Sequence, residues 1–378
     1  MKYDEAIEYM ESLSHEEWME TRDTFHRLCE KLGNPWQELS FIHISAGDHK
    51  GSVPAYVSFV LQAAGYKVGR YISQTILRFS ERLQVGNKPI TKKYFAELTQ
   101  RVKDACRELG EEGYPAVTFY EAEAAMMFLC FKEHGVQAVV AETGLGTRNH
   151  SYNRIIEEWI MQHYPPLEMK MNSTAKRVRY GLKKQRFDYR EWRGLEITSP
   201  GVGRLESAVN AVRIIESLQK MGYSIAEKAL RKGLAEASFI GDFSVLGKNP
   251  YAAIDPVHTK EDALELAKSI QTYFPERKVV FIAGMIQSDE YAGLFEPLNP
   301  FAKFVITVPV WDKKESMGSY QLASGLIKLN PNVTAVDSLE EAVEISCLLA
   351  EKSDVVIGFG ADIFLGRLAT ILSDRNRQ

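Results

Sequence analysis

The sequence predicts an α/β protein of two domains, and three observations support this prediction. The chain has 378 residues, which is more than one hydrophobic core usually serves. Short apolar segments typical of strands alternate with amphipathic segments typical of helices, as in parallel sheets joined by crossover helices. The composition also resets near residue 240, where a second series of short apolar strands begins. We therefore expect domains at residues 1–240 and 241–378.

The expected first domain starts with two helices and then alternates between strand and helix. The two helices span residues 2–13 and 16–32, where apolar side chains recur at helical spacing. Three strands follow, one starting near residue 40 and two more at residues 65–72 and 136–142. Further helices are expected at residues 53–64, 92–109, 118–134, 205–221 and 224–237. Residues 73–91 are expected to form a polar loop, and residues 150–190 the least regular part of the chain.

The expected second domain is a smaller α/β unit with six short strands. These apolar segments lie at residues 241–246, 252–255, 278–283, 304–307, 333–336 and 354–358. Helices at residues 260–273 and 338–352 separate some of them. Strands that alternate with helices in this way predict a second, smaller α/β unit.

Composition and charge exclude several classes of protein. A net charge of -4 argues against a general binder of nucleic acid or anionic membranes, because both functions need a cationic surface. The basic stretch at residues 176–193 is the exception, and we interpret it as a solvated surface in preference to a nucleic-acid groove. The four cysteines show no metal-ligand spacing, and no signal peptide or membrane-length apolar run is seen. These features predict a cytoplasmic protein.

The segment from residue 40 to residue 52 has the pattern of a phosphate-binding loop. An apolar strand leads into a turn that carries Gly47, and Lys50, Gly51 and Ser52 then open a helix. In such loops the helix N-terminus faces an anion, while a lysine binds the outer phosphates and a hydroxyl binds Mg²⁺. However, His49 stands where these loops usually have a glycine that gives the backbone room. A surface loop with a chance Lys-Gly-Ser is the alternative interpretation.

Several motifs share their order and approximate spacing with one known family. They lie at residues 43–52, 68–73, 77–82, 118–121, 142–148 and 255–258. In these motifs the chain resembles folylpolyglutamate synthase/dihydrofolate synthase of the Mur ligase superfamily. The similarity covers nearly the whole chain apart from residues 150–185. It implies a Mur-ligase-type P-loop ATPase-like domain with a parallel-rich central sheet, followed by a smaller Rossmann-like α/β domain.

The resemblance also implies a reaction and the residues that perform it. The family uses ATP and Mg²⁺ to phosphorylate a folate-like carboxylate, and the amino group of glutamate then attacks the acyl phosphate. Lys50 and the neighbouring loop residues Gly47, His49 and Gly51 would bind the phosphates. Ser52 and Glu142 would bind the metal, although an acidic residue at the end of a strand is also a common capping device.

The family's Asp-x-x-His motif in the second domain corresponds to Asp255 and His258. The resemblance implies that Asp255 binds the nucleotide and that His258 is catalytic. Spacing of this kind is weak on its own, because a structural hydrogen-bonded pair would produce the same pattern.

The sequence departs from the family pattern at positions that handle charge. His49 and Asp48 replace the loop's usual Gly and Asn, and Asp48 would lie near phosphate charge. The family's Gly-Arg-Phe-Glu motif, whose arginine reaches the phosphates, has Asp242 in place of the arginine. Nothing between residues 149 and 189 matches the family's second metal ligand or its modified lysine. Losing one preorganised charge contact typically costs ~10²–10³ in rate.

Two hypotheses therefore follow from the sequence. In the first, the chain is an active ATP-dependent ligase that joins an amino acid such as glutamate to a folate-like carboxylate. In the second, which we favour, it is a homologue that has lost the standard ligase reaction and binds a small ligand or a protein partner. Neither hypothesis involves nucleic acid or a membrane.

Overall fold

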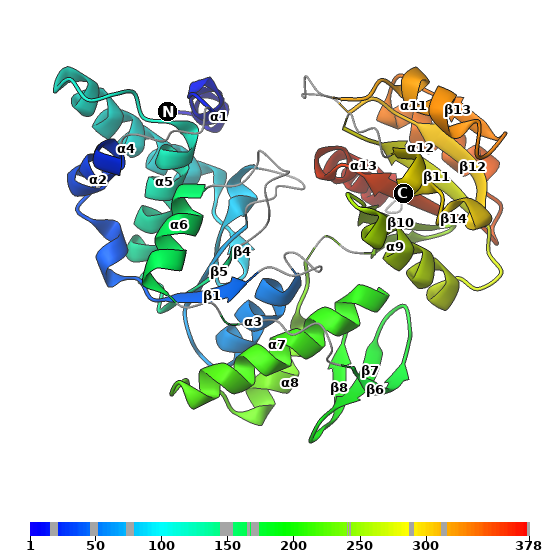
Figure 1. Ribbon diagram of the computed structural model, residues 1–378, viewed down its shortest axis with the longest axis horizontal. Helices are drawn as coiled ribbons and strands as arrows, with labels where there is room; N and C mark the ends of the chain where they lie inside the picture. The colour runs from blue at the N-terminus through cyan, green and yellow to red at the C-terminus, as the bar shows by residue number, and fades with distance from the viewer. Residues whose placement is uncertain are drawn as a thin grey trace. The chain divides into compact units, whose positions relative to one another are not determined.

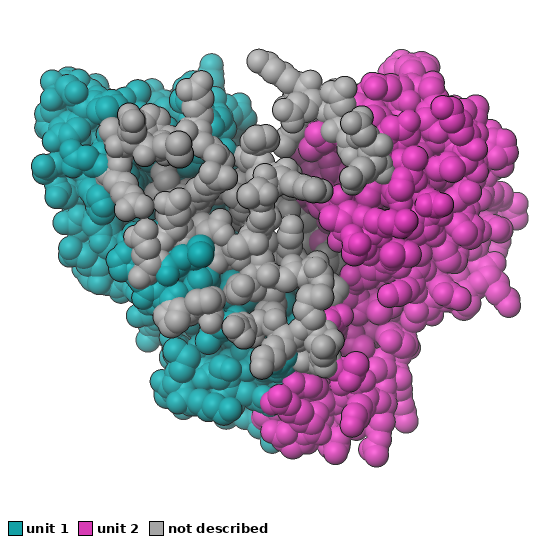
Figure 2. All heavy atoms as spheres, viewed as in Figure 1, with its two compact units in different colours: residues 1–173, 210–236 teal, residues 174–209, 237–378 magenta. Residues whose placement is uncertain are grey.

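The computed structural model describes most of the chain in two compact units. The described residues are 1–15, 22–45, 52–72, 79–143, 154–164, 167, 174–239, 241, 243–286, 291–310 and 316–375. Unit 1 comprises residues 1–173 and 210–236, and unit 2 comprises residues 174–209 and 237–378 (Figures 1 and 2). The predicted domains with a boundary near residue 240 stay a prediction.

Unit 1 is built on a five-stranded sheet with the strand order β1-β5-β2-β3-β4. Its parallel part consists of β1 (Phe41–Ser45), β5 (Ala138–Thr143) and β2 (Val68–Tyr71). These three strands were expected from the sequence. The antiparallel edge consists of β3 (Leu83–Val85) and β4 (Lys88–Pro89). This hairpin lies inside the expected polar loop at residues 73–91, so that prediction was wrong for the hairpin.

Helices cover both faces of the unit 1 sheet. Four main helices, α1 (Tyr3–Ser12), α2 (Arg22–Lys31), α4 (Lys92–Glu111) and α5 (Phe119–Glu133), share one hydrophobic core with α6 (Arg154–His163). On the opposite face α3 (Ser52–Ala63) packs against β2 and β5, and α8 (Glu227–Glu236) packs against α3. Short 3₁₀ turns, η1 (Pro35–Glu38) and η2 (Phe79–Arg82), precede β1 and β3.

Unit 2 is built on a six-stranded sheet with the order β13-β12-β11-β14-β10-β9. The strands are β9 (Ser244–Lys248), β10 (Tyr251–Pro256), β11 (Val279–Gly284), β12 (Ala302–Thr307), β13 (Val333–Ala335) and β14 (Val355–Gly360). All pairs are parallel except the edge pair of β9 and β10. These six strands correspond to the six expected apolar segments, and the alternation with helices correctly predicted an α/β unit.

The unit 2 sheet has a hydrophobic core on each face. α9 (Lys260–Tyr273), α10 (Tyr291–Phe295) and α11 (Ser319–Leu326) contribute to one core, which also reaches the turn η3 (Asn299–Phe301). α12 (Leu339–Leu349) and α13 (Asp362–Arg375) contribute to the other. Of these, α9 and α12 were expected from the sequence. Within the described part of the chain, no helix is long and apolar enough to cross a membrane.

Unit 2 also contains a separate three-stranded antiparallel sheet, which precedes α7 (Val202–Lys220) in the chain. This sheet consists of β6 (Lys176–Arg179), β7 (Gln185–Tyr189) and β8 (Trp192–Ile197) (Figure 1). The sequence suggested irregular structure here, so that prediction was wrong for these strands. The inward side chains Phe187, Leu195 and Ile197 are fully buried, while the cations between them point outward and hide the alternation from composition.

Candidate functional site

The carboxyl ends of β1 and β5 lie side by side at one edge of the unit 1 sheet. Their parallel register pairs Ile44 with Glu142 and Ser45 with Thr143. β1 leads along the chain to α3, which begins at Ser52. In open α/β sheets ligands bind outside the carboxyl ends of the strands, and this edge is where the sequence placed the phosphate loop. The predicted strand and helix on either side of the loop are therefore confirmed.

The structure describes only some of the predicted site residues in unit 1. Ser52 is the first residue of α3 and is 2% exposed. Gly47, His49, Lys50 and Gly51 lie outside the described residues. For Glu142 the structure describes the backbone, in β5 beside Ile44 of β1, but not the side chain. The predicted phosphate contacts of Lys50 and the predicted metal contacts of Ser52 and Glu142 stay predictions.

The strand β1 is anchored by contacts to the chain beyond α6. His43 is buried, and its Nδ1 atom lies 2.8 Å from the carbonyl oxygen of Tyr164. The hydroxyl of Tyr164 donates to the carbonyl of Leu39 at 2.8 Å. The backbone N–H of Leu167 in turn donates to the carbonyl of His43. These bonds fix the strand that precedes the loop.

The helix α3 is buried on nearly all sides, which fixes where its N-terminus lies. Its apolar side chains Val53, Val57 and Val60 are fully buried. A Cβ atom added to Gly233 of α8 would lie 2.4 Å from the Cα of Val60, so α8 approaches α3 at backbone distance. No acidic residue occupies the first turn of α3. Its positive dipole end therefore has no carboxylate of its own in that turn.

The unit 2 sheet carries Asp255 and His258 at its carboxyl edge. Asp255 lies in β10 opposite Phe359 of β14 and is 8% exposed. His258 follows β10, and its Nε2 atom lies 3.4 Å from Oδ2 of Asp362, the first residue of α13. The sequence reasoning missed Asp362. The structure thus gives His258 a carboxylate partner from the neighbouring parallel strand's helix, at the edge that the motif predicted.

The N-terminus of α9, which follows His258, is capped by the chain itself. Oδ2 of Asp262 accepts the backbone N–H groups of His258 and Thr259 at 2.9 Å each. The side chain of Thr259 accepts the N–H of Asp262, which completes a capping box. A carboxylate therefore already occupies the anion position at this helix. The N-terminus of α3 differs from that of α9, because no acidic residue lies in its first turn.

Arg204 holds the segment where the family's arginine motif would lie. It is 1% exposed, and its Nη2 atom donates to the carbonyl oxygens of Phe239 at 3.3 Å and Gly241 at 2.8 Å. The same atom lies 3.2 Å from Oγ of Ser244, and the guanidinium stacks 4.1 Å from the Phe239 ring centroid. Asp242 lies outside the described residues. Arg204 is thus committed to backbone carbonyls of this segment.

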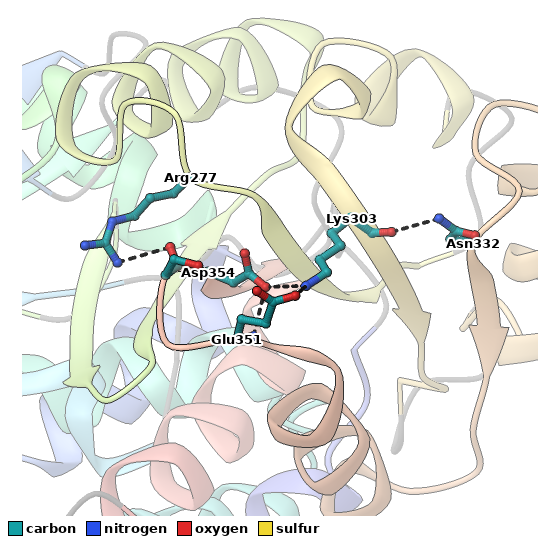
Figure 3. Close-up of polar contacts among 6 residues, drawn as sticks. Arg277, Lys303, Asn332, Glu351 and Asp354 are labelled. Atoms are coloured by element: carbon teal, nitrogen blue, oxygen red, sulfur yellow. Dashed lines mark hydrogen bonds and ion pairs between the residues drawn. The ribbon is translucent and has the colours of Figure 1, made fainter.

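The opposite, amino edge of the unit 2 sheet carries charges that satisfy one another (Figure 3). Lys303 of β12 donates to Asp354 at 2.7 Å and to Glu351 at 2.8 Å. Asp354 also accepts the backbone N–H of Glu351. Asn332 and Arg277 each donate to a backbone carbonyl at this edge. This cluster links β12 to the turn before β14 and stabilises the fold, and we call it a structural staple.

Comparison with known proteins shows which proteins share this architecture. No protein-family model matches the sequence. The chain is 23% identical over 337 residues to the dihydrofolate synthase/folylpolyglutamate synthase of Bacillus subtilis strain 168, which covers 73% of this chain and 78% of that protein. The folylpolyglutamate synthase of Thermotoga maritima superimposes with a TM-score of 0.79 at 22% identity, over 98% of this chain and 96% of that one.

A folylpolyglutamate synthase of Mycobacterium tuberculosis, solved in complex with ADP, has a TM-score of 0.82 at 16% identity, over 98% of each chain. The resemblance seen in the motifs is thereby confirmed. So is the predicted fold class, because the chain has the α/β fold of the folylpolyglutamate synthases.

Proposed function

We propose that this protein binds the phosphates of Mg-ATP at the carboxyl edge of the unit 1 sheet and has lost the standard ligase reaction. One observation carries the proposal: the buried helix α3 follows β1 directly across the loop, with no carboxylate in its first turn. A helix N-terminus in this position attracts anions through its free N–H groups and its dipole. Lys50, Ser52 and Glu142 would hold the nucleotide and the metal.

The proposed loss of the reaction rests on the sequence. Bound ATP would supply the phosphoryl group that activates a carboxylate, and that transfer needs several fixed cations. Here Asp242 inverts the charge of the family's arginine, and the segment with the second metal ligand and the lysine has no counterpart. Arg204 contacts this segment, but it donates there to the backbone carbonyls of Phe239 and Gly241. The protein would then serve as a ligand-binding or partner-binding homologue.

The second candidate function is the active ligase that joins an amino acid such as glutamate to a folate-like carboxylate. It is favoured by the 3.4 Å contact between His258 and Asp362 at the carboxyl edge of the unit 2 sheet. An imidazole held by a carboxylate is a common arrangement for proton transfer. Such a group would be retained in an enzyme that still handles the attacking amine.

Calorimetric titration with Mg-ATP tests the binding, and an ADP-release assay with a folate, glutamate and ATP tests the reaction. We expect saturable binding to the native protein and its loss in Lys50→Ala, because the lysine binds the outer phosphates. Lys93→Met is the matched control, since it removes a lysine that is 88% exposed on α4. Absence of binding at millimolar nucleotide would refute the binding site. Folate-dependent and glutamate-dependent ADP release would establish the second candidate instead.

A further inference from the structure

Arg70 is a buried cation without a carboxylate partner. It lies in β2, one residue before the end of the strand, and is 4% exposed. Its Nη2 atom donates to Oε1 of Gln84, which is a neutral amide. Among the described residues no acidic side chain forms an ion pair with it, and its buried Nε atom has no hydrogen-bond partner. The guanidinium thus has unused donors inside the protein.

Apart from Gln84 of β3, the described residues in register with Arg70 are apolar. Its neighbours in β2 point to the other face, since a Cβ on Gly69 would meet Phe131 of α5 and the Tyr71 hydroxyl bonds to Glu123 of α5. Strand alternation therefore places Arg70 on the face that α3 covers. The buried residues of that face in register with it are Val140 of β5 and, beyond it, Ile42 of β1.

A charge in such a position destabilises the ligand-free protein. Burying an ion is costly unless other groups replace its hydration, and one neutral amide replaces little of it. The other two buried arginines among the described residues show how the chain compensates a buried charge elsewhere. Arg82 bonds to the carboxylate of Glu123, and Arg204 bonds to two backbone carbonyls and a hydroxyl. Arg70, with one neutral amide, therefore has the fewest compensating groups among the buried arginines that the structure describes.

The position of Arg70 relates it to the carboxyl edge of the sheet. β2 pairs with β5, whose end lies beside the end of β1, and α3 starts from this edge. Gln84, which holds Arg70, also donates to the carbonyl of Glu81 in the turn η2 where the chain passes that edge. The Arg70 guanidinium and the N-terminus of α3 thus lie on the same face of the unit 1 sheet, toward the carboxyl ends of its parallel strands.

We infer that Arg70 is the cationic group of an oxyanion subsite in unit 1, filled by a phosphate or carboxylate of the bound ligand. The inference rests on the proposed function, because it deepens the ligand site at the carboxyl edge. Burial lowers the pKa of Arg70 to about 10, so the group stays charged at neutral pH.

The experiment compares the melting temperatures of the native protein, Arg70→Met and Lys93→Met, with and without added anion. The probes are Mg-ATP, tripolyphosphate and glutarate, each titrated separately. We expect Arg70→Met without ligand to melt roughly 2–4 °C higher, because methionine fills the space without an uncompensated charge. Its apparent affinity for the effective anion should fall about 10–100-fold, the effect of losing a charge-assisted hydrogen bond. Lys93→Met should match the native protein in both respects.

The three probes identify the source of the oxyanion. A response to tripolyphosphate and Mg-ATP that weakens in Arg70→Met assigns a phosphate to the subsite, and the same pattern with glutarate assigns a carboxylate. Equal responses of native protein and Arg70→Met would overturn the inference and leave the proposed function standing. No response of the native protein to any probe would overturn both.

A second variant covers the case in which Arg70→Met is less stable. Arg70→Lys keeps the charge but loses the planar fork and the Nε donor. We expect it to fold and to bind the effective anion more weakly than the native protein by at least about tenfold. Unchanged anion affinity in Arg70→Lys together with a lowered melting temperature of Arg70→Met would show that the guanidinium serves the fold alone, and would overturn the inference.

Discussion

Arg70 and Arg82 are both buried in unit 1, yet their surroundings differ in a way that separates structure from function. Arg82 pairs with Glu123 on the α5 face, and the hydroxyl of Tyr71 donates to the same carboxylate at 2.9 Å. The polar groups of this network satisfy one another, so it needs no ligand. Arg70 lies in β2 on the face that α3 covers, and its hydrogen-bond partner among the described residues is the neutral side chain of Gln84. A closed network stabilises the fold, whereas an open one is available to an added group.

The same distinction separates the two edges of the unit 2 sheet. At the amino edge, Lys303, Glu351 and Asp354 form a closed cluster (Figure 3). At the carboxyl edge, Oδ2 of Asp362 contacts His258, but its buried Oδ1 atom has no hydrogen-bond partner among the described residues. Arg70 and Asp362 both lie toward the carboxyl ends of the strands in their units, the edge where ligands of α/β sheets bind.

The largest expected effect comes from opening the closed network of unit 1. Glu123→Gln leaves the buried guanidinium of Arg82 without its carboxylate, and breaking a buried pair in this way typically costs about 3–5 kcal/mol. Burial alone would lower the pKa of Arg82, but Glu123 holds it above its ordinary value, which shows that the carboxylate compensates the charge. Chemical denaturation at pH 7 measures the loss in the free energy of unfolding.

The same helix supplies a matched control. Glu133 of α5 also bonds to an arginine, Arg101, and to a tyrosine, Tyr94, but its side chain is 33% exposed. Glu133→Gln should cost no more than about 1 kcal/mol, because exposed pairs contribute little. If both substitutions destabilised the protein equally, burial would not be what distinguishes the closed network.

Much of the fold could be predicted from the sequence because apolar periodicity reports burial directly. The parallel strands β1, β2 and β5 and all six strands of the unit 2 sheet were expected in this way. The hairpin of β3 and β4 was missed although its turn, Gly86 and Asn87 with φ near +59° at both residues, is a recognisable hairpin signal. Its strands have only three and two residues, too few for alternation to show.

The site was harder to predict because its partners come from distant parts of the chain. The motif at residues 255–258 led to Asp255 and His258, but Asp362 is brought to His258 only by the parallel pairing of β10 with β14. Arg70 was missed because a single arginine in a short strand is normally expected on a solvent-facing side. Only the position of α3 over that face shows that the residue is buried. The spacing of residues along the chain does not show which strands and helices lie next to one another in the folded protein.

An intermediate effect is expected from opening the closed cluster of unit 2. Asp354 is 5% exposed, and Asp354→Asn removes the charge that Lys303 contacts. We expect a loss of about 1.5–3 kcal/mol in the free energy of unfolding, the range for a hydrogen bond to a charged group. Chemical denaturation checks this value, and a loss below about 0.3 kcal/mol would contradict the assignment of this cluster as a staple.

The pH dependence of the same variant tests the electrostatic origin of that loss. The hydrogen bonds to Asp354 and Glu351 raise the pKa of Lys303 above its ordinary value. A lysine with a raised folded-state pKa contributes its full stability below its unfolded pKa of about 10.4, and loses it as the pH rises through the folded pKa. The advantage of the native protein over Asp354→Asn should be constant from about pH 7 to 10 and shrink above that.

The smallest effect is expected from Asp362→Asn at the open edge of unit 2. The His258 and Asp362 side chains are 34% and 16% exposed, and a partly solvated pair of this kind contributes little to folding. The free energy of unfolding should therefore change by no more than about 0.5 kcal/mol, well below the loss in Asp354→Asn from the opposite edge. A loss above about 1.5 kcal/mol would show that the Asp362 carboxylate stabilises the fold, as Asp354 does. A small change, with Asp354→Asn destabilised, would instead show that the carboxylate at the carboxyl edge of the sheet serves a purpose other than stability.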